Sequence, residues 1–511
     1  MTLKKRSITK INVIKLRKNQ VQKWTWLFFC KQIKNFSPKG LTKRQKCAVY
    51  FISLLIKSTL VNRGKSTIYK ENTMNYNPKI IKRILKKCIN EISAHPELFA
   101  KNPGKDFTRE RKLPFGQILK SVLSMTGKSL RGELMDFFNL SNSMPTVSAF
   151  VQQRNKIDYR AFEILFGTFY EAIDEQKLFK GYRLLAVDGS DLHTPTNKDE
   201  QDSFFEGTNG QKPYNLLHLN ALYDLQRRIY TDAIVQGRNC ENEHRAFVTM
   251  VDRDNSSIPT IYIADRGYES YNNMAHVIEK GQKFVIRVKD LASNGIVSAL
   301  SLPEADEFDV CFSLGLTRKQ TNEVKKSNLK YLPHNVNFDF LPKTSRKSIP
   351  MSPYYISFRL VRFKLTEDTY ELLITNLAEE EFDVDELKEL YAMRWGIETS
   401  FRNLKYSLAL SYFHSKKTEN ILQEVFAKLT MYNFAELITS HVVVKHKNRK
   451  HSYRINFAAA VLICRNFFLK NISPSDVEAL LLMHLLPVRK GSANPRRGSP
   501  KAAPSFTYRI P

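Results

Sequence analysis

The sequence predicts an α/β protein in which a helical amino-terminal domain precedes a core that a β-rich insertion interrupts. Three observations support this fold class. Apolar residues recur at a spacing near 3.6 from Tyr76 to about Lys180, which is typical of amphipathic helices. From Tyr182 short apolar runs alternate with helical segments, as in a sheet covered by helices. Between Asp290 and about Tyr370 short strand-like pieces and basic stretches break that alternation.

Composition limits the possible partners and compartments. With 511 residues and 42% hydrophobic content, the chain is long enough for two to four domains with substantial cores. Its net charge of +30 indicates a polyanionic partner, either nucleic acid or an acidic membrane surface. No apolar run reaches the 18 or so residues of a membrane helix, so we expect no membrane partner and a cytoplasmic location. The six cysteines show no C-x-x-C pairing, which argues against a disulfide framework or a cysteine zinc site.

Residues 1–73 form a basic extension with 18 Lys and Arg against one acid, Glu71. Two interpretations compete. The segment could be a nucleic-acid-binding arm, or an extension of the reading frame in front of a true start at Met74. We favour the second, because an almost acid-free run with aperiodic aromatic residues has no clear folding logic.

Residues 74–180 are predicted to form a small helical domain. The runs IIKRILKKCINEI, FGQILKSVLSM and AFEILFGTFYEAIDE carry the helical period, and Ser148 is a plausible cap for a helix that begins at Ala149. The domain could simply pack against the core. Its density of Lys and Arg also suits a DNA-binding domain.

Residues 181–290 are predicted to form the first part of the core. The runs YRLLAVDGS, YNLLHLNALYD and RIYTDAIVQ read as a meander, and helices and strands alternate after them. Asp188 and Asp265 each follow a short apolar run, so each carboxylate is expected at the end of a buried strand. A single aspartate in such a place is usually a turn former.

The β-rich insertion is placed at residues 291–370, and the second part of the core at residues 371–450, beginning with the strand ELLITNL. Residues 451–511 are expected to hold carboxy-terminal helices and a basic tail. Between Pro487 and Pro511 the tail has six Lys and Arg, five Pro and no acid, which suits an extended segment over DNA or a partner subunit.

The run from Tyr391 to Lys405 is the most informative stretch, because it has the spacing Y-x2-R-x3-E-x6-K. On one helix, Tyr391, Arg394, Glu398 and Lys405 would share a face. A carboxylate beside two cations and a phenol suits a site for metal and phosphate. Taken alone, the pattern also fits a solvated helix with ordinary i,i+4 ion pairs. The two strand-end aspartates favour three carboxylates that meet at one sheet edge. A neighbouring apolar stripe would seat the helix on a core: Leu390, Ile397, Phe401, Leu404 and Leu408.

These motifs resemble those of the DDE transposases of the IS4 insertion-sequence family. The resemblance rests on Asp188 in VDGS, Asp265 in ADRGY, the strand ELLITNL and the Y-x2-R-x3-E-x6-K signature, which occur in the family's order. It covers roughly Met74 to Pro511 and leaves residues 1–73 outside. It implies an RNase H-like core that brings the two aspartates to neighbouring positions.

The resemblance also implies a function and a set of site residues. Asp188, Asp265 and Glu398 would be catalytic and would bind metal, and Tyr391, Arg394 and Lys405 would bind DNA phosphates. The cofactor would be Mg²⁺ or Mn²⁺, as two ions. The substrate would be double-stranded DNA, at element ends and target, bound by a homodimer associated with the nucleoid. Two alternatives stay open: an RNase H-like nuclease without strand transfer, and a catalytically inactive DNA-binding regulator.

Overall fold

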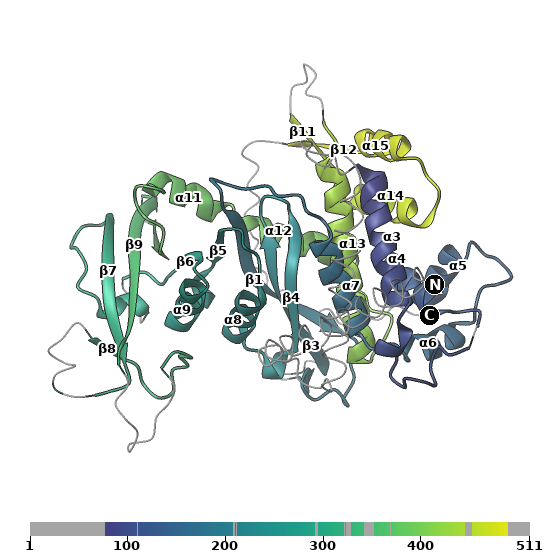
Figure 1. The fold of residues 1–511 in the computed structure, drawn as a ribbon, viewed down its shortest axis with the longest axis horizontal. Coiled ribbons are helices and arrows are strands. Elements are labelled where there is room, and N and C mark those ends of the chain that lie inside the picture. Colours follow the sequence, from purple (N-terminus) through teal and green to yellow (C-terminus); the bar gives the residue numbers. More distant parts are fainter. Residues whose placement is uncertain are drawn as a thin grey trace, which may run out of the picture. The chain divides into compact units, whose positions relative to one another are not determined.

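The computed structural model describes residues 77–488, apart from gaps at 110, 208–209, 211, 292–294, 321, 323–328, 342–351, 368 and 445–451 (Figure 1). The expected basic extension, the start at Met74 and most of the basic tail lie outside the described residues. Among the described helices, none combines the length and the apolar character that a membrane span requires.

The amino-terminal part of the described chain is helical, as predicted. Its helices are α3 (Pro78–Ser93), α4 (Phe115–Ser124), α5 (Leu130–Phe137), α6 (Val147–Arg154) and α7 (Arg160–Glu171).

The predicted cap at Ser148 is wrong, because α6 begins two residues earlier. Thr146 has extended backbone angles, and its hydroxyl accepts a hydrogen bond of 3.2 Å from the Ala149 amide. This satisfies one of the free amides of the first turn. Ser148 already lies inside the helix and cannot fill that role.

A ten-stranded mixed sheet forms the centre of the protein. Strands β1, β3 and β4 make the predicted antiparallel meander, while β5 and β6 add in parallel to β1. The sheet order is β2-β3-β1-β5-β6-β10-β9-β7-β8, with β4 also on β3. The strands are β1 (Arg183–Thr194), β2 (Phe204–Phe205), β3 (Tyr214–Asp224), β4 (Ile229–Gly237), β5 (Thr260–Ala264), β6 (Lys283–Arg287), β7 (Phe308–Thr317), β8 (Leu329–Tyr331), β9 (Tyr354–Thr366) and β10 (Thr369–Thr375).

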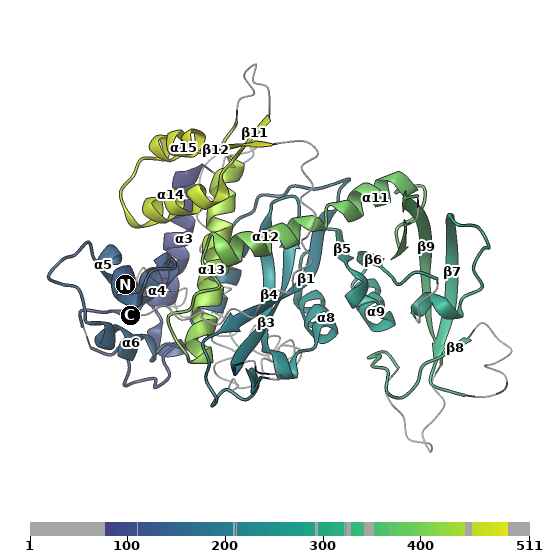
Figure 2. The same ribbon diagram turned by 180° about the vertical axis from the view of Figure 1, so that it is seen from behind.

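Helices cover both faces of this sheet. On one face α8 (Glu243–Arg253) and α9 (Tyr271–Glu279) pack on side chains such as Leu185 and Tyr262. On the other, α11 (Val384–Ala392) packs on side chains such as Leu184, and Figures 1 and 2 show the two sets of helices from opposite sides. Successive residues of a strand point to opposite faces, so a strand buried on both faces is apolar throughout. This explains the continuous apolar runs in the sequence.

The predicted insertion supplies strands to the core sheet. Strand β10 pairs with β6 through Leu373 and Arg287, and on its other edge it pairs with β9 along seven residues. Strand β9 then pairs with β7. The described strands of this region, β7, β8 and β9, therefore extend the same hydrogen-bonded sheet.

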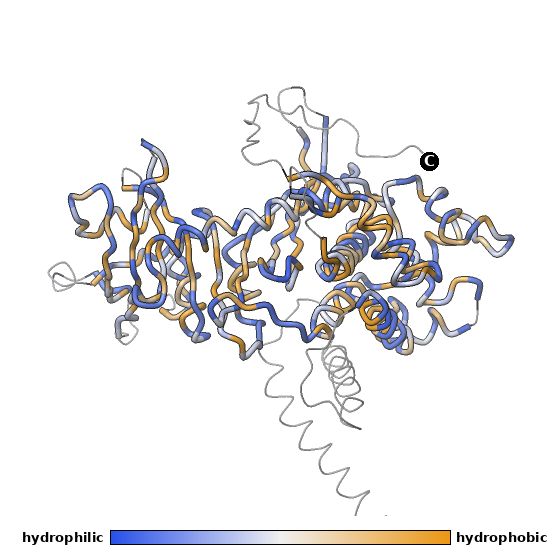
Figure 3. The backbone as a smooth tube through the Cα atoms, turned by 90° about the horizontal axis from the view of Figure 1, so that it is seen from above, coloured by the Kyte–Doolittle hydropathy of each residue, from blue (hydrophilic) through white to orange (hydrophobic). Residues whose placement is uncertain are grey.

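Helix α13 (Thr418–Ser440) is the central element of the helical region. It is buried from Asn420 to Thr439 on nearly every side, as expected for a helix enclosed by others. Figure 3 shows hydrophobic stretches alternating with hydrophilic ones along the described chain, which fits elements that each bury one side. The chain continues with β11 (Ser452–Ile455), α14 (Phe457–Leu469), α15 (Pro474–Met483) and β12 (Leu485–Val488).

A buried cluster of charged side chains ties the amino-terminal helices to α13. The Arg154 guanidinium lies 2.9 Å from the Glu424 carboxylate, and both side chains are at most 2% exposed. His414 Nδ1 lies 3.0 Å from the other Glu424 oxygen. The fully buried Lys428 donates to the Met125 carbonyl. Buried charges persist only where partners compensate them, so this cluster fixes how the two regions pack.

Candidate active site

Asp188 lies in the middle of β1, at the point where the parallel part of the sheet ends. The expectation that it ends its strand is wrong, since β1 continues to Thr194 in antiparallel pairing with β3. Parallel pairing with β5 stops at Ala186, opposite Ile263. Asp188 thus follows the last parallel pair, where a carboxylate can leave the apolar layer.

Asp265 directly follows β5, as predicted. Ala186 pairs with Ile263, so the same register continued by two residues places Asp188 opposite Asp265. Asp265 Oδ1 accepts a 2.9 Å hydrogen bond from the Gly267 amide, which opens a short 3₁₀ turn from Arg266 to Tyr268. The two aspartates therefore belong to one edge of the sheet.

Glu398 lies in the first turn of α12 (Trp395–Tyr406). The prediction of one continuous helix from Tyr391 to Lys405 is wrong, because α11 ends at Ala392 and Arg394 occupies the turn between the helices. The Arg394 amide bonds the Tyr391 carbonyl three residues back, and Gly396 bonds Met393 in the same way. A glycine in this place weakens the helix and favours such a tight turn.

The predicted apolar stripe does seat α12 on the core. Ile397 and Leu404 are fully buried, and Phe401 is 6% exposed. The Ser400 hydroxyl lies 2.8 Å from the Tyr230 hydroxyl of β4. This contact fixes the helix two residues beyond Glu398.

The electrostatics of Asp188 show that the three carboxylates share one environment. Burial raises the pKa of Asp188 to about 6, and the charges of Asp265 and Glu398 add to that rise. The Gly189 amide and the Arg394 guanidinium act in the opposite direction. Carboxylates that repel one another in this way form a site for cations.

Arg394 and Tyr391 border the carboxylates. Arg394 is 6% exposed, and its guanidinium donates to Glu398 at 2.8 Å. The Tyr391 side chain is 5% exposed, and its hydroxyl has no hydrogen-bond partner among the described residues. Burial raises the pKa of Tyr391 to about 12, so the phenol keeps its proton and remains a donor.

Lys405 lies in the last turn of α12, further along the site than Glu398. The hydrogen bond with His218 lowers the pKa of Asp191, and the charges of His218, Arg238 and Lys405 add to that effect, so Lys405 lies within electrostatic reach of Asp191 on β1. The structure thus brings Asp188, Asp265, Glu398 and Arg394 together, with Tyr391 at one side and Lys405 at the other.

Three further residues lie at the site: Tyr268, His218 and Glu243. The sequence patterns indicated no role for His218 or Glu243. Tyr268 is 1% exposed, and its hydroxyl has no hydrogen-bond partner in the described part of the chain. Burial raises its pKa, and the negative charges of Glu243, Asp188 and Asp265 raise it further. A β-carbon at Gly189 would lie 2.8 Å from Glu243 Oε1 and 2.3 Å from His218 Nε2. No spacing in the sequence relates these residues. Tyr268 lies three residues after Asp265, inside the ADRGY motif that the sequence had already singled out.

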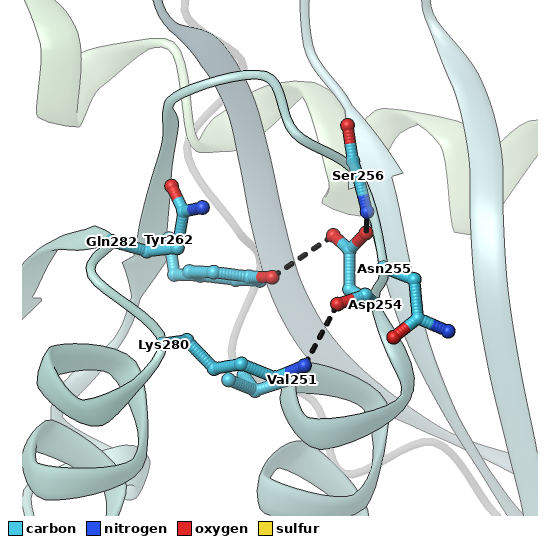
Figure 4. A pocket seen from close by; sticks show the side chains of 7 residues that line it. All are labelled: Val251, Asp254, Asn255, Ser256, Tyr262, Lys280 and Gln282. Carbon is cyan, nitrogen blue, oxygen red and sulfur yellow. Dashed lines mark hydrogen bonds between the residues drawn. The ribbon is translucent and has the colours of Figure 1, made fainter. Parts of the chain in front are cut away.

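A separate cavity of about 180 Å³ lies at the opposite end of β5, near the start of Thr260–Ala264 (Figure 4). Its polar groups bond one another: the Tyr262 hydroxyl donates to Asp254 at 3.0 Å, and Lys280 donates to the Asp254 carbonyl at 2.9 Å. Arg183 also pairs with Asp254. Because the polar groups of the lining already bond one another, we assign this cavity a structural role.

A family profile described as the Transposase DDE domain matches residues 179–434, which is half of the chain. The chain belongs to the DDE transposase family. The match covers β1 to α13, so all three carboxylates of this transposase lie inside it.

A relative of known family agrees with this assignment. The transposase is 23% identical over 356 residues to the Transposase InsG for insertion sequence element IS4 of Escherichia coli (strain K12), covering 66% of this chain and 73% of that protein. The resemblance to the IS4 family is thereby confirmed. A structure of the piggyBac transposase synaptic complex with hairpin DNA aligns at 10% identity with a TM-score of 0.40, over 84% of this chain and 91% of that one.

Proposed function

We propose that this transposase cleaves DNA at the ends of its own insertion sequence and joins the freed 3′-hydroxyl to target DNA, with Asp188, Asp265 and Glu398 as catalytic metal ligands. The observation that carries the proposal is the register of β1 and β5, which places Asp188 opposite Asp265 at one sheet edge, while the charge of Glu398 acts on the same Asp188 carboxyl. Three carboxylates whose charges act on one another repel, so bound cations are needed to keep all three ionised.

The donor set fits Mg²⁺ or Mn²⁺. All three side chains offer oxygen atoms, which are the ligands that these ions prefer. Two such ions would activate the attacking hydroxyl or water and stabilise the leaving oxygen. Arg394 holds the Glu398 carboxylate at 2.8 Å and so fixes its orientation.

The cations around the carboxylates would position the DNA. Lys405 extends the site beyond Asp188, and Arg394 supplies a second positive charge. Charge-assisted hydrogen bonds to phosphate oxygens would hold the scissile strand in register. The Tyr391 hydroxyl would donate a further hydrogen bond to this site.

The strand order supports an RNase H-like core. An antiparallel meander of β4, β3 and β1 is followed by the parallel strands β5 and β6, and the two aspartates are borne by adjacent strands. This is the arrangement that the resemblance implied for residues 181–290 and 371–450. The β-rich insertion at 291–370 would then be an extension of the core sheet.

We propose DNA binding for the helical domain at residues 74–180. A pocket of about 280 Å³ lies beside α6, and its lining carries several cations. The side chains of Lys105, Arg109 and Arg111 have no ion pair with any described residue. Its lining residues include Lys105, Phe107, Arg109, Arg111, Gln153 and Lys156. Several cations around one pocket suit DNA phosphates.

Replacing Lys105, Arg109 and Arg111 together by glutamine is expected to weaken binding to an element end. If each contacts one phosphate, the slope of log affinity against log salt should decrease by about 2.7. Gel shifts at several salt concentrations measure this slope. The matched control replaces Lys319, Lys364 and Lys417, three exposed cations outside the helical domain, and should leave the slope nearly unchanged. An equal effect of both triple variants would indicate general charge loss and contradict a specific pocket.

Bound to two DNA ends, the transposase is proposed to act as a homodimer associated with the nucleoid. Light scattering of a complex with short end fragments tests the stoichiometry. A strand-transfer assay with a target plasmid tests the reaction, and cleavage without joined product would instead indicate a nuclease.

A further inference from the structure

Four polar residues from three segments meet beside the strand that carries Asp188. Asp191 on β1 is directly opposite His218 on β3, and Glu241 and Glu243 lie where the chain leads into α8. The His218 side chain is 5% exposed. Asp191 Oδ1 lies 2.7 Å from His218 Nδ1, and Glu241 Oε2 lies 3.1 Å from the same nitrogen. The three ligand atoms lie within 4.8 Å of one another.

A single proton on His218 Nδ1 cannot satisfy both carboxylate oxygens that face it. An imidazole nitrogen carries at most one hydrogen, so Nδ1 can donate to only one of the two carboxylate oxygens. Glu241 Oε2 is buried and has no hydrogen-bond partner among the described residues. A buried anionic oxygen without a partner is costly. A cation between the three atoms would accept a lone pair from each of them.

The charge balance agrees with a divalent ion. Arg238 pairs with Glu241 Oε1, and its Nε lies 3.4 Å from Asp191 Oδ1. Asp191, Glu241 and Glu243 carry three negative charges against the Arg238 guanidinium and the Lys405 ammonium, so the cluster around a neutral imidazole keeps a net negative charge. Glu243 Oε1 lies 2.9 Å from His218 Nε2. Its charge favours the tautomer with the proton on Nε2, which leaves the Nδ1 lone pair available to a metal.

We infer that Asp191, His218 and Glu241 form a metal site separate from the three catalytic carboxylates. One imidazole nitrogen with two carboxylate oxygens suits Zn²⁺ or Mn²⁺ better than Mg²⁺, which prefers oxygen alone. The ion would join β1, β3 and the start of α8. Because His218 and Glu243 lie against the backbone at Gly189, next to Asp188, the ion would also hold the strand that positions Asp188.

The test removes the catalytic carboxylates and asks whether an ion still binds. The full-length Asp188→Asn, Asp265→Asn, Glu398→Gln variant is dialysed against Zn²⁺ and then against buffer, and bound metal is measured. One equivalent is expected to remain. Co²⁺ loaded in its place should give visible absorption typical of nitrogen and oxygen ligands, without thiolate charge transfer from the six cysteines.

Ligand variants in that background identify the site. His218→Gln or Glu241→Gln should reduce retained metal to near zero, while Glu243→Gln should weaken binding by about 10–100-fold. His244→Gln is the matched control, because His244 lies close by on α8 but bonds Asn273 at 2.9 Å. Circular dichroism checks folding, and Glu241→Gln serves where His218→Gln fails to fold. Absence of bound metal in the parent variant, or undiminished binding in Glu241→Gln, would overturn the site and indicate a protonated His218 shared among carboxylates.

Discussion

Glu398→Gln is expected to abolish metal-dependent nicking at an element end while binding to that end stays nearly intact. The change keeps the shape of the side chain and its contact with Arg394, but it removes the charge that is proposed to hold a metal ion. A lost metal ligand costs several kcal/mol of transition-state stabilisation, so cleavage should fall by at least about 10³-fold. Asp188→Asn and Asp265→Asn should behave in the same way.

Cleavage and gel-shift assays on the same labelled DNA end measure both properties. Glu389→Gln is the matched control, because Glu389 is an exposed carboxylate on α11 and should leave both unchanged. Lys405→Ala should weaken cleavage through poorer positioning of the DNA without removing it. Near-normal cleavage by Glu398→Gln would show that Glu398 is not the third carboxylate.

Glu424→Gln is expected to destabilise the fold by about 3–5 kcal/mol, because it leaves Arg154 buried without its counter-charge. The Glu424 side chain is 1% exposed and lies 2.9 Å from Arg154. The control is Glu419→Gln on the same helix, whose carboxylate pairs with Lys101 but is 37% exposed. Loss of an exposed pair costs about 0–1 kcal/mol. Urea midpoints and thermal unfolding compare the two variants.

The same prediction has a pH dependence. Burial alone raises the pKa of Glu424, but Arg154, His414 and Lys428 together lower it from 4.5 to about 2. A carboxyl whose pKa is lowered on folding stabilises the protein above its unfolded value, and this contribution disappears as the pH falls towards the folded value. The stability gap between the wild type and Glu424→Gln should therefore shrink between about pH 4.5 and pH 2. A constant gap would mean that the charge of Glu424 is not responsible.

Elements with a strong internal period could be predicted from the sequence. The apolar runs of β1, β3, β5 and β6 and the periodic helices at both ends of the chain appear where expected, because burial alone specifies them. The three proposed catalytic carboxylates were likewise placed by short motifs. Errors occurred where local hydrogen bonding decides a boundary, as at Thr146 before α6 and in the turn at Arg394.

Contacts between segments that are distant in the chain could not be predicted from the sequence. His218 and Asp191 meet because β1 and β3 pair in one particular register, and a shift of one residue would separate them. The same limit hid the buried cluster around Glu424, whose partner Arg154 comes from a helix 270 residues earlier. Neither arrangement leaves a recognisable spacing in the chain.

The pairing of β6 with β10 has a consequence for synthesis on the ribosome. Arg287 and its partner Leu373 are 86 residues apart, and the strands between them are added outside β10. At about 5–20 residues per second, the free edge of β6 would wait about 4–17 s for its neighbour. An unpaired apolar edge can recruit strands from other chains during that interval. Nascent transposase should therefore be most prone to aggregate, and most dependent on chaperones, while residues 288–373 are being translated.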